Sequence, residues 1–130
     1  MGMKVLIDTH VLLWALMEPG HLSPIATGLI SDPSTTLVVS SASAWEIATK
    51  HRLGRLDGAE PVVHGYHAHL ERLGAEELPI RADHAILAGS LDGEHRDPFD
   101  RMLAAQALIE TIPIVTGDEA ISGLGAPTLW

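Results

Sequence analysis

The sequence predicts an α/β fold, a three-layer sandwich in which helices cover both faces of a central parallel sheet of four to five strands. Short apolar runs, typical of strands buried on both faces, alternate with longer segments that carry helix signals. This alternation predicts right-handed βαβ crossovers, which place helices on both faces of a parallel sheet. The chain has 130 residues, of which 46% are hydrophobic, and we expect one domain with one core over residues 1–130.

The expected strands are the short apolar and β-branched runs of the chain. In the first run, only Lys4 interrupts the apolar residues, and the run ends at Asp8. The second run is rich in β-branched residues, which favour strands. The C-terminal residues are expected to add an edge strand. In chain order the predicted strands are 3–7, 36–40, 77–80, 112–116 and 128–130.

The expected helices begin at capping residues and end at glycine or proline. Ser23 before Pro24 and Asp97 before Pro98 are pairs of an N-cap and a first-turn residue. Gly74 is expected to close a helix. In chain order the predicted helices are 11–17, 24–31, 41–56, 61–73, 82–91, one that begins at 98 and a short one from 119.

The helix predicted for 41–56 is expected to stop near Gly54. Its apolar residues should form the face that packs against the rest of the protein. These residues are Trp45, Ile47, Ala48 and Leu53.

Charge and composition limit the classes of function. The formal net charge of −9 has the wrong sign for an ordinary nucleic-acid binder, so a polyanionic substrate would need local positive charge. Three basic residues lie close together, at Lys50, Arg52 and Arg55. The absence of cysteine excludes a disulfide framework and a thiolate metal site. No apolar run approaches the roughly 20 residues that span a bilayer, and we expect a cytoplasmic protein with no membrane partner.

Four acidic residues stand at the predicted boundaries of elements, at Asp8, Glu46, Asp100 and Asp118. Ligands of parallel α/β sheets bind beyond the carboxyl ends of the strands, where Asp8 and Asp118 are expected. Each acid except Asp8 also has a local explanation. Glu46 completes a capping box with Ser43, Asp100 suits a helix first turn, and Asp118 suits a turn or helix cap. For Asp8, at the end of an apolar strand, no helix first turn is obvious.

Four carboxylates gathered in one place would repel one another unless a divalent cation offsets their charge. Oxygen ligands without cysteine favour Mg²⁺ or Mn²⁺ over structural zinc. Such a site suits phosphodiester hydrolysis, because a metal ion activates water and neutralises charge on the phosphate.

Four segments of the chain resemble the PIN-domain ribonucleases, with the greatest similarity to the VapC-type toxins of toxin–antitoxin pairs. The resemblance covers nearly the whole chain, and the four acids occur in the family's order. The segments are LIDTHVLLWAL at 6–16, SASAWEIATKHRLGRL at 41–56, HRDPFDRMLAAQAL at 95–108 and IVTGDEAI at 114–121.

This resemblance implies a PIN-like fold and an endoribonuclease that depends on Mg²⁺ or Mn²⁺. By position, the catalytic and metal-binding acids would be Asp8, Glu46, Asp100 and Asp118. Thr116 matches a hydroxyl position on the strand before the last acid, and we expect Asp97 to be a helix cap and an outer-shell residue. The resemblance further implies a homodimer, inhibited by a small VapB-like antitoxin whose C-terminal segment enters the acidic site.

Two roles remain open for the basic cluster. Lys50, Arg52 and Arg55 could bind RNA, or they could form a solvated helix face in which Lys50 pairs with Glu46 one turn away. For His95, we expect a structural hydrogen bond and not a metal ligand.

Two other functions are weighed against the nuclease. A receiver-like phosphoacceptor domain has similar length and element order, but it needs a lysine near the C-terminus, and this chain has no Lys or Arg after Arg101. A catalytically silent PIN scaffold that binds only a partner protein would not need the four acids.

Overall fold

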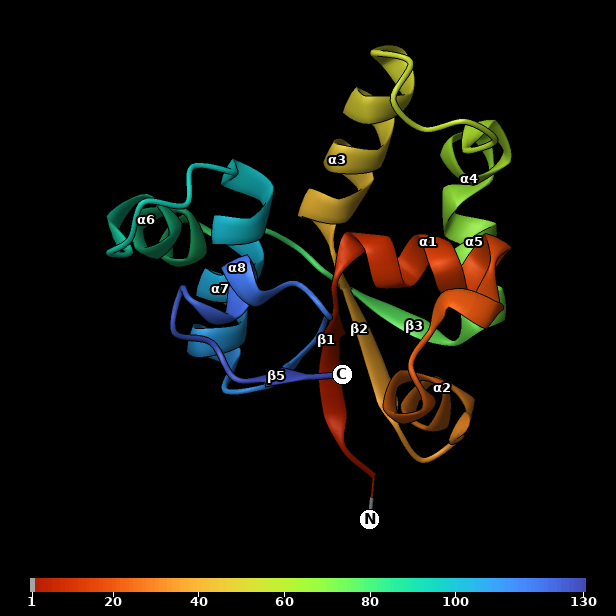
Figure 1. Cartoon of the computed structure of the whole chain (residues 1–130), viewed down its shortest axis with the longest axis horizontal. Coiled ribbons are helices and arrows are strands. Elements are labelled where there is room, and N and C mark those ends of the chain that lie inside the picture. The colour runs from red at the N-terminus through yellow and green to blue at the C-terminus, as the bar shows by residue number, and fades with distance from the viewer. Residues whose placement is uncertain (1) are drawn as a thin grey trace.

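Five parallel strands form the central sheet in the computed structural model, which describes residues 2–130 (Figure 1). Their spatial order is β3-β2-β1-β4-β5, and every neighbouring pair is parallel. The predicted α/β class and parallel sheet are therefore confirmed, with five strands. The strands are β1 (Lys4–Ile7), β2 (Thr36–Ser40), β3 (Ala75–Leu78), β4 (Ile114–Val115) and β5 (Thr128–Leu129).

Helices cover both faces of this sheet, as a three-layer sandwich requires (Figure 1). One layer holds α1, α2, α4 and α5, and the other holds α6, α7 and α8. The helix α3 rises from the carboxyl end of β2 between the two layers. The helices are α1 (Thr9–Met17), η1 (Pro19–His21), α2 (Pro24–Ser31), α3 (Ser41–Arg52), α4 (Glu60–His64), α5 (Tyr66–Leu73), α6 (Ala82–Ser90), α7 (Pro98–Glu110) and α8 (Glu119–Ser122). Of the helices in residues 2–130, none is long and apolar enough to cross a membrane.

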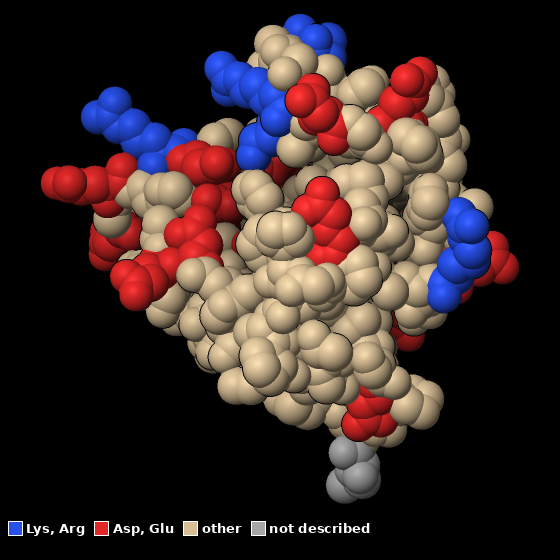
Figure 2. Space-filling view, turned by 45° about the vertical axis from the view of Figure 1, so that its right-hand side comes forward, with Lys and Arg blue, Asp and Glu red and all other residues tan. Residues whose placement is uncertain are grey.

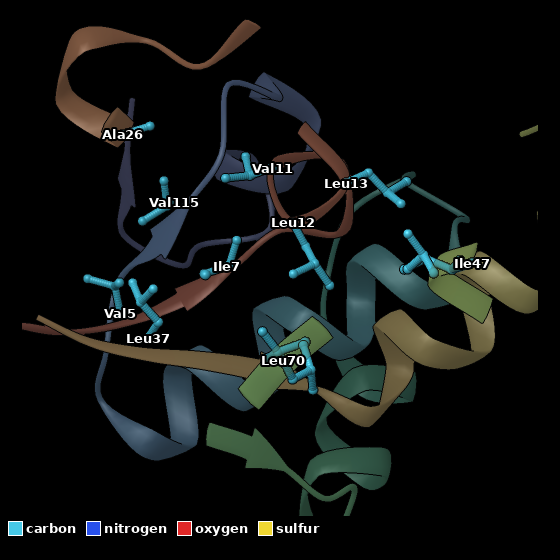
Figure 3. Close-up of a cluster of buried hydrophobic side chains, with 12 residues drawn as sticks. Val5, Ile7, Val11, Leu12, Leu13, Ala26, Leu37, Ile47, Leu70 and Val115 are labelled. Carbon is cyan, nitrogen blue, oxygen red and sulfur yellow. The ribbon is translucent and has the colours of Figure 1, made fainter. Parts of the chain in front are cut away.

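The alternation of side chains along β1 builds a separate core on each face of the sheet. Val5 and Ile7 point to the layer of α1, where they join a cluster that includes Leu12 (Figure 3). Leu6, between them, points to the opposite face and joins a cluster with Leu103 of α7. Full burial of each such side chain stabilises the fold by roughly 1.5–3 kcal/mol. The two cores fix α1 and α7 against opposite faces of β1.

The predicted helix caps are confirmed. The Ser23 hydroxyl accepts a hydrogen bond from the Ala26 N–H at 3.1 Å. The Asp97 carboxylate accepts from the Phe99 N–H at 2.9 Å. Gly74 closes α5 with a φ of 74°, a left-handed conformation that glycine adopts at little cost.

The helix predicted for 61–73 is instead two helices, α4 and α5, that meet at Gly65. The Gly65 N–H closes α4 by donating to the Pro61 carbonyl, and the chain then changes direction. Both short helices bury an apolar residue, Val62 from α4 and Leu70 from α5, against the same core. The prediction of one continuous helix was wrong because Gly65, with φ −113° and ψ 30°, leaves the helical conformation between α4 and α5. The strand expected at 77–80 begins at Ala75, directly after the turn at Gly74.

The inward face predicted for the helix at 41–56 was also wrong. Trp45 is 58% exposed and Leu53 is 49% exposed, and Ala48 is exposed as well. Of the predicted face only Ile47 is buried, and α3 ends at Arg52. The helix stands at the edge of the sheet and buries a narrow stripe at helical spacing, made of Ala42, Ser43, Glu46 and Ile47.

Candidate active site

Three of the four predicted acids are buried at the carboxyl ends of the strands. Asp8 follows β1 directly and precedes α1, Glu46 lies on α3, and Asp100 lies in the first turn of α7. They are 5%, 3% and 8% exposed, respectively. Their negative charges act on one another, since the charges of Asp8 and Glu46 both raise the pKa of Asp100. These three residues are called the acidic cluster below.

Asp8 is held by a hydroxyl from the neighbouring strand end. Thr116 Oγ1 donates to Asp8 Oδ2 at 2.7 Å and accepts from the Asp118 N–H at 3.0 Å. Burial raises the pKa of Asp8, the Thr116 hydrogen bond and the nearby His10 oppose the shift, and Glu46 adds to it. Asp8 also immediately precedes α1, so a helix does begin beside it, contrary to the sequence-based expectation.

Glu46 is paired with Lys50 one helical turn away. Glu46 Oε2 lies 2.5 Å from Lys50 Nζ, the ion pair that one of the two open interpretations of the basic cluster contained. Burial lowers the pKa of Lys50, but the hydrogen bond and charge of Glu46 outweigh it and leave the pKa raised. The other oxygen, Glu46 Oε1, is buried and has no hydrogen-bond partner within residues 2–130.

The capping box proposed for Glu46 was wrong. Ser40, and not Ser43, caps α3 by accepting from the Ala42 N–H at 3.0 Å. The Ser43 hydroxyl instead lies 2.8 Å from the Thr9 hydroxyl of α1. Glu46 is therefore free of any capping role and is directed into the acidic cluster.

Asp100 is paired with His95 from the segment that leads into α7. His95 Nε2 lies 2.7 Å from Asp100 Oδ2, which confirms a structural hydrogen bond for this histidine. Burial raises the pKa of Asp100 to about 6, although the His95 hydrogen bond lowers it. Asp97 caps α7, and its charge acts on both Lys50 and Asp100. Asp97 is therefore the cap of α7 and lies beside the acidic cluster, while its role as an outer-shell residue stays a prediction.

Asp118 has a different position from the other three acids. It is exposed and caps α8, since its Oδ1 accepts from the Ala120 N–H at 2.9 Å. The cap explanation is thus confirmed. Asp118 also lines a hollow together with Asp8. The structure therefore places Asp118 at the rim of the site, joined to Asp8 through Thr116.

The basic residues of the region divide into two groups. Lys50 contacts the acidic cluster through its ion pair with Glu46. Arg52 and Arg55 are exposed at and just beyond the end of α3. Figure 2 shows Lys and Arg side chains gathered at the top of the molecule, where α3 ends in Figure 1, above acidic side chains. These two arginines could meet a polyanion that approaches the acidic cluster.

The chemistry of the acidic cluster fits a hard divalent cation. All of its donors are carboxylate oxygens, the ligands that Mg²⁺ and Mn²⁺ prefer. The unpartnered Glu46 Oε1 is a second indication of a cation site, because burying a carboxylate oxygen without a partner costs folding free energy. Among residues 2–130, no three acidic or histidine side chains are already arranged to enclose an ion. Lys50 and His95 instead occupy one oxygen each of Glu46 and Asp100.

Some residues around the site were missed or undervalued from the sequence. Arg101 donates to the carbonyl oxygens of Ala88, at 2.8 Å, and His95, at 3.0 Å, and also to that of Leu91. It thereby fixes the segment that carries His95. His10 and Trp14 of α1 line the hollow beside Asp8 together with Trp130, and nothing in their local sequence indicates that α1 and the C-terminal segment meet there.

Comparison with known proteins agrees with the geometry. The family described as PIN domain matches residues 5–126. Ribonuclease VapC22 of Mycobacterium tuberculosis (strain ATCC 25618 / H37Rv) is 30% identical over 132 residues, covering 97% of this chain and 98% of that protein. Ribonuclease VapC16 of the same organism is 37% identical over 60 residues, covering 46% of this chain and 41% of that protein.

Two solved structures share the fold. A chain of the VapBC2 structure from Rickettsia felis, bound to a DNA fragment from their promoter, has a TM-score of 0.69 at 16% identity and covers 98% of each chain. A chain of the FitAcB structure from Neisseria gonorrhoeae has a TM-score of 0.61 at 18% identity, covering 97% of this chain and 96% of that one. The parallel five-stranded sheet, the buried acids at its carboxyl edge and the match over residues 5–126 place this chain in the PIN-domain family, among the VapC ribonucleases.

Proposed function

We propose that this protein is a metal-dependent endoribonuclease that hydrolyses RNA phosphodiester bonds and acts as the toxin of a toxin–antitoxin pair. The observation that carries the proposal is the acidic cluster, three buried carboxylates with one unpartnered oxygen at the carboxyl edge of the sheet. A structural role alone does not account for three buried acids whose charges oppose one another. The relatives named as VapC ribonucleases support the same activity.

Asp8, Glu46 and Asp100 would hold the cation, Mg²⁺ or Mn²⁺, and Asp118 would contribute from the rim. When bound, the ion supplies a Lewis acid that lowers the pKa of water and neutralises charge on the phosphate. Thr116 orients Asp8 through its hydrogen bond and links it to the Asp118 backbone. Asp97 fixes the start of α7 and with it the position of Asp100.

Lys50 and His95 each contact one carboxylate of the acidic cluster. Lys50 offsets the charge of Glu46, and His95 binds one oxygen of Asp100. Each of these contacts uses one carboxylate oxygen, so the second oxygen of Glu46 and of Asp100 is left for a ligand. We infer that an entering cation takes over part of the charge compensation that Lys50 supplies.

The experiment that tests the activity is incubation of structured RNAs with Mg²⁺ or Mn²⁺. We expect cleavage by the wild type and at least a hundredfold slower cleavage by Asp8→Asn and Asp100→Asn. Arg72→Ala, on α5 and away from the acids, serves as a control that should cleave like the wild type. Equal cleavage by the wild type and the three variants would show that the acidic cluster does not take part in the reaction.

The partners of the proposed toxin are RNA, a small antitoxin protein and a second copy of the chain. The solved structures with this fold include VapBC2 and FitAB, each bound to DNA, which supports a VapB-like partner here. An arginine of that partner would suit the carboxylates of the acidic cluster. The site of action would be the cytoplasm. Expression should arrest growth, and co-expression of a small protein encoded next to this gene should restore it; arrest by Asp100→Asn as well would contradict the proposal.

Membership in the PIN-domain family does not favour the receiver-like alternative. A catalytically silent scaffold is also not favoured, because all four acids are present and three are buried together. The RNA cleavage assay separates the silent scaffold from the nuclease directly.

A further inference from the structure

An aromatic hollow lies directly beside the acidic cluster. Its volume is about 350 Å³, within the range of small-ligand sites, which runs from roughly 300 to 1,000 Å³. Two elements far apart in sequence build it: α1 with the residue before it, and the C-terminal segment from 117 to 130. Its lining includes Asp8, His10, Trp14, Gly117, Asp118 and Trp130.

Three aromatic rings of the hollow lie close to one another. The Trp14 and Trp130 ring centroids are 6.0 Å apart with the planes tilted by 42°. The His10 ring centroid is 5.9 Å from that of Trp14. His21 stacks on Trp14 at 5.6 Å and 16°, and its own Nε2 lies 2.9 Å from Glu18 Oε2, which holds the Trp14 ring in place.

Trp130 is positioned by its neighbour Gly117. A Cβ atom at Gly117 would lie 2.9 Å from the Trp130 ring, so the ring rests directly on this glycine. The Thr116 N–H donates to the Leu129 carbonyl at 3.0 Å and fixes the backbone on either side of the contact. The indole of Trp130 is thus held next to Asp118, and Trp130 remains 38% exposed.

We propose that this hollow binds an unpaired nucleobase of the RNA, beside the phosphodiester bond at the acidic cluster; this rests on the proposed function. Exposed aromatic rings are the surfaces on which unpaired bases stack, whereas a paired base within a duplex does not offer its face. None of the described residues that line the hollow is Lys or Arg, so the hollow offers a phosphate no positively charged partner. The base is the part of a nucleotide that these walls can accept, while the phosphate lies nearer the acidic cluster.

The three tryptophans of the chain allow a direct test by fluorescence. A single-stranded eight-residue oligoribonucleotide is titrated into the protein in EDTA, where cleavage is prevented. The Trp45→Leu protein, whose remaining indoles are Trp14 and Trp130, should be quenched and bind like the wild type. The double variant Trp14→Leu/Trp130→Leu, which keeps only Trp45, should show little quenching and bind about tenfold more weakly or worse, the effect expected for loss of base stacking.

Conservative variants separate stacking from folding. Trp14→Phe and Trp130→Phe keep a ring and should bind within about threefold of the wild type, whereas His10→Ala, at an exposed residue, should bind several-fold more weakly. If circular dichroism shows that the double leucine variant is unfolded, the comparison of His10→Ala with the phenylalanine variants tests whether the rings of the hollow bind RNA. Unchanged RNA affinity in His10→Ala and in every folded tryptophan variant would overturn the proposal.

Two further comparisons identify the ligand. A duplex of the same sequence should compete at least tenfold more weakly than the single strand, and equal competition would overturn the proposal. If the tryptophan variants lose antitoxin binding but keep the RNA affinity of the wild type, the proposal is also overturned, because the hollow would then bind protein. Cleavage is scored separately in Mn²⁺: if the wild type binds the single strand through the hollow but cuts no RNA, the proposed function fails and the base site stands.

Discussion

Thr116 and Asp8, 108 positions apart in the sequence, are joined by a hydrogen bond of 2.7 Å between the ends of β4 and β1. The same hydroxyl accepts the Asp118 N–H at 3.0 Å. One side chain therefore sets the position of a buried carboxylate and of the loop that carries the rim carboxylate. The short strand β4 brings Thr116 to this place because it pairs in parallel with β1.

Replacing Thr116 by valine should uncouple these two acids. The variant keeps the shape of the side chain but removes the hydrogen bond that lowers the pKa of Asp8. We expect a loss of about 1–2 kcal/mol in the free energy of unfolding and weaker Mn²⁺ binding, measured by urea unfolding and calorimetry. Thr116→Ser keeps the hydroxyl and should behave like the wild type, and equal loss in both variants would contradict the role of the hydroxyl.

Removal of Lys50 should expose the repulsion within the acidic cluster. In Lys50→Met, Glu46 is buried without its cation, so in EDTA we expect a loss of roughly 1–2 kcal/mol in unfolding free energy. Millimolar Mn²⁺ should restore part of this loss, because a bound cation offsets the same charge. Thermal unfolding with and without Mn²⁺ measures both effects. A Tm deficit that Mn²⁺ leaves unchanged would mean that Glu46 does not bind the ion.

Asp100 should make the stability of the metal-free protein depend on pH. Its pKa is raised from 3.8 to about 6 by burial, so the folded state binds the proton more tightly than the unfolded state. The stability this contributes is fully present below pH 3.8 and is lost as the pH rises through 6. Asp100→Asn, which mimics the protonated form, should therefore gain stability relative to the wild type as the pH rises from 4 to 7, by on the order of 2–3 kcal/mol. The check is urea unfolding of both proteins in EDTA across this range, and a constant difference would show that the carboxyl is not perturbed.

Arg52 and Arg55 should contribute to RNA affinity without affecting the metal. In Arg52→Glu/Arg55→Glu, RNA binding should weaken at least tenfold, and the dependence of log K on log salt should become shallower by about 1.4 if each arginine contacts one phosphate of a single strand. Mn²⁺ binding should stay within about twofold of the wild type. Fluorescence polarisation at several salt concentrations measures the slope. An unchanged RNA affinity would mean that these arginines do not bind RNA and only form a solvated helix end.

The sheet and much of its edge could be predicted because their signals are local. Apolar runs defined the strands, and the pairs of Ser23 with Pro24 and Asp97 with Pro98 defined two helix starts. The rule that ligands lie at the carboxyl edge of a parallel sheet then placed Asp8 at the site. The grouping of Asp8, Glu46 and Asp100 agrees with the sequence-based set, while their roles toward a metal stay predictions.

The remaining features depend on tertiary contacts that short patterns do not contain. The pattern around Ser43 and Glu46 fits a capping box, yet Ser43 pairs with Thr9 across two helices, and Ser40 makes the cap. Trp45 was expected in the core because it is apolar, but it remains 58% exposed on α3, where its ring packs edge-on against Phe99 of α7 at 4.7 Å. The aromatic hollow joins Trp14 to Trp130, residues whose proximity follows from the parallel pairing of β4 with β1 and of β5 with β4.

The most direct test of the acidic cluster is the binding of Mn²⁺ followed by electron paramagnetic resonance. We expect the wild type to bind the ion and Asp8→Asn/Asp100→Asn to bind it at least tenfold more weakly. Glu60→Gln, which removes an exposed carboxylate of α4, should bind like the wild type. If the double variant binds Mn²⁺ as tightly as the wild type, the acidic cluster is not the metal site and the proposed mechanism is wrong.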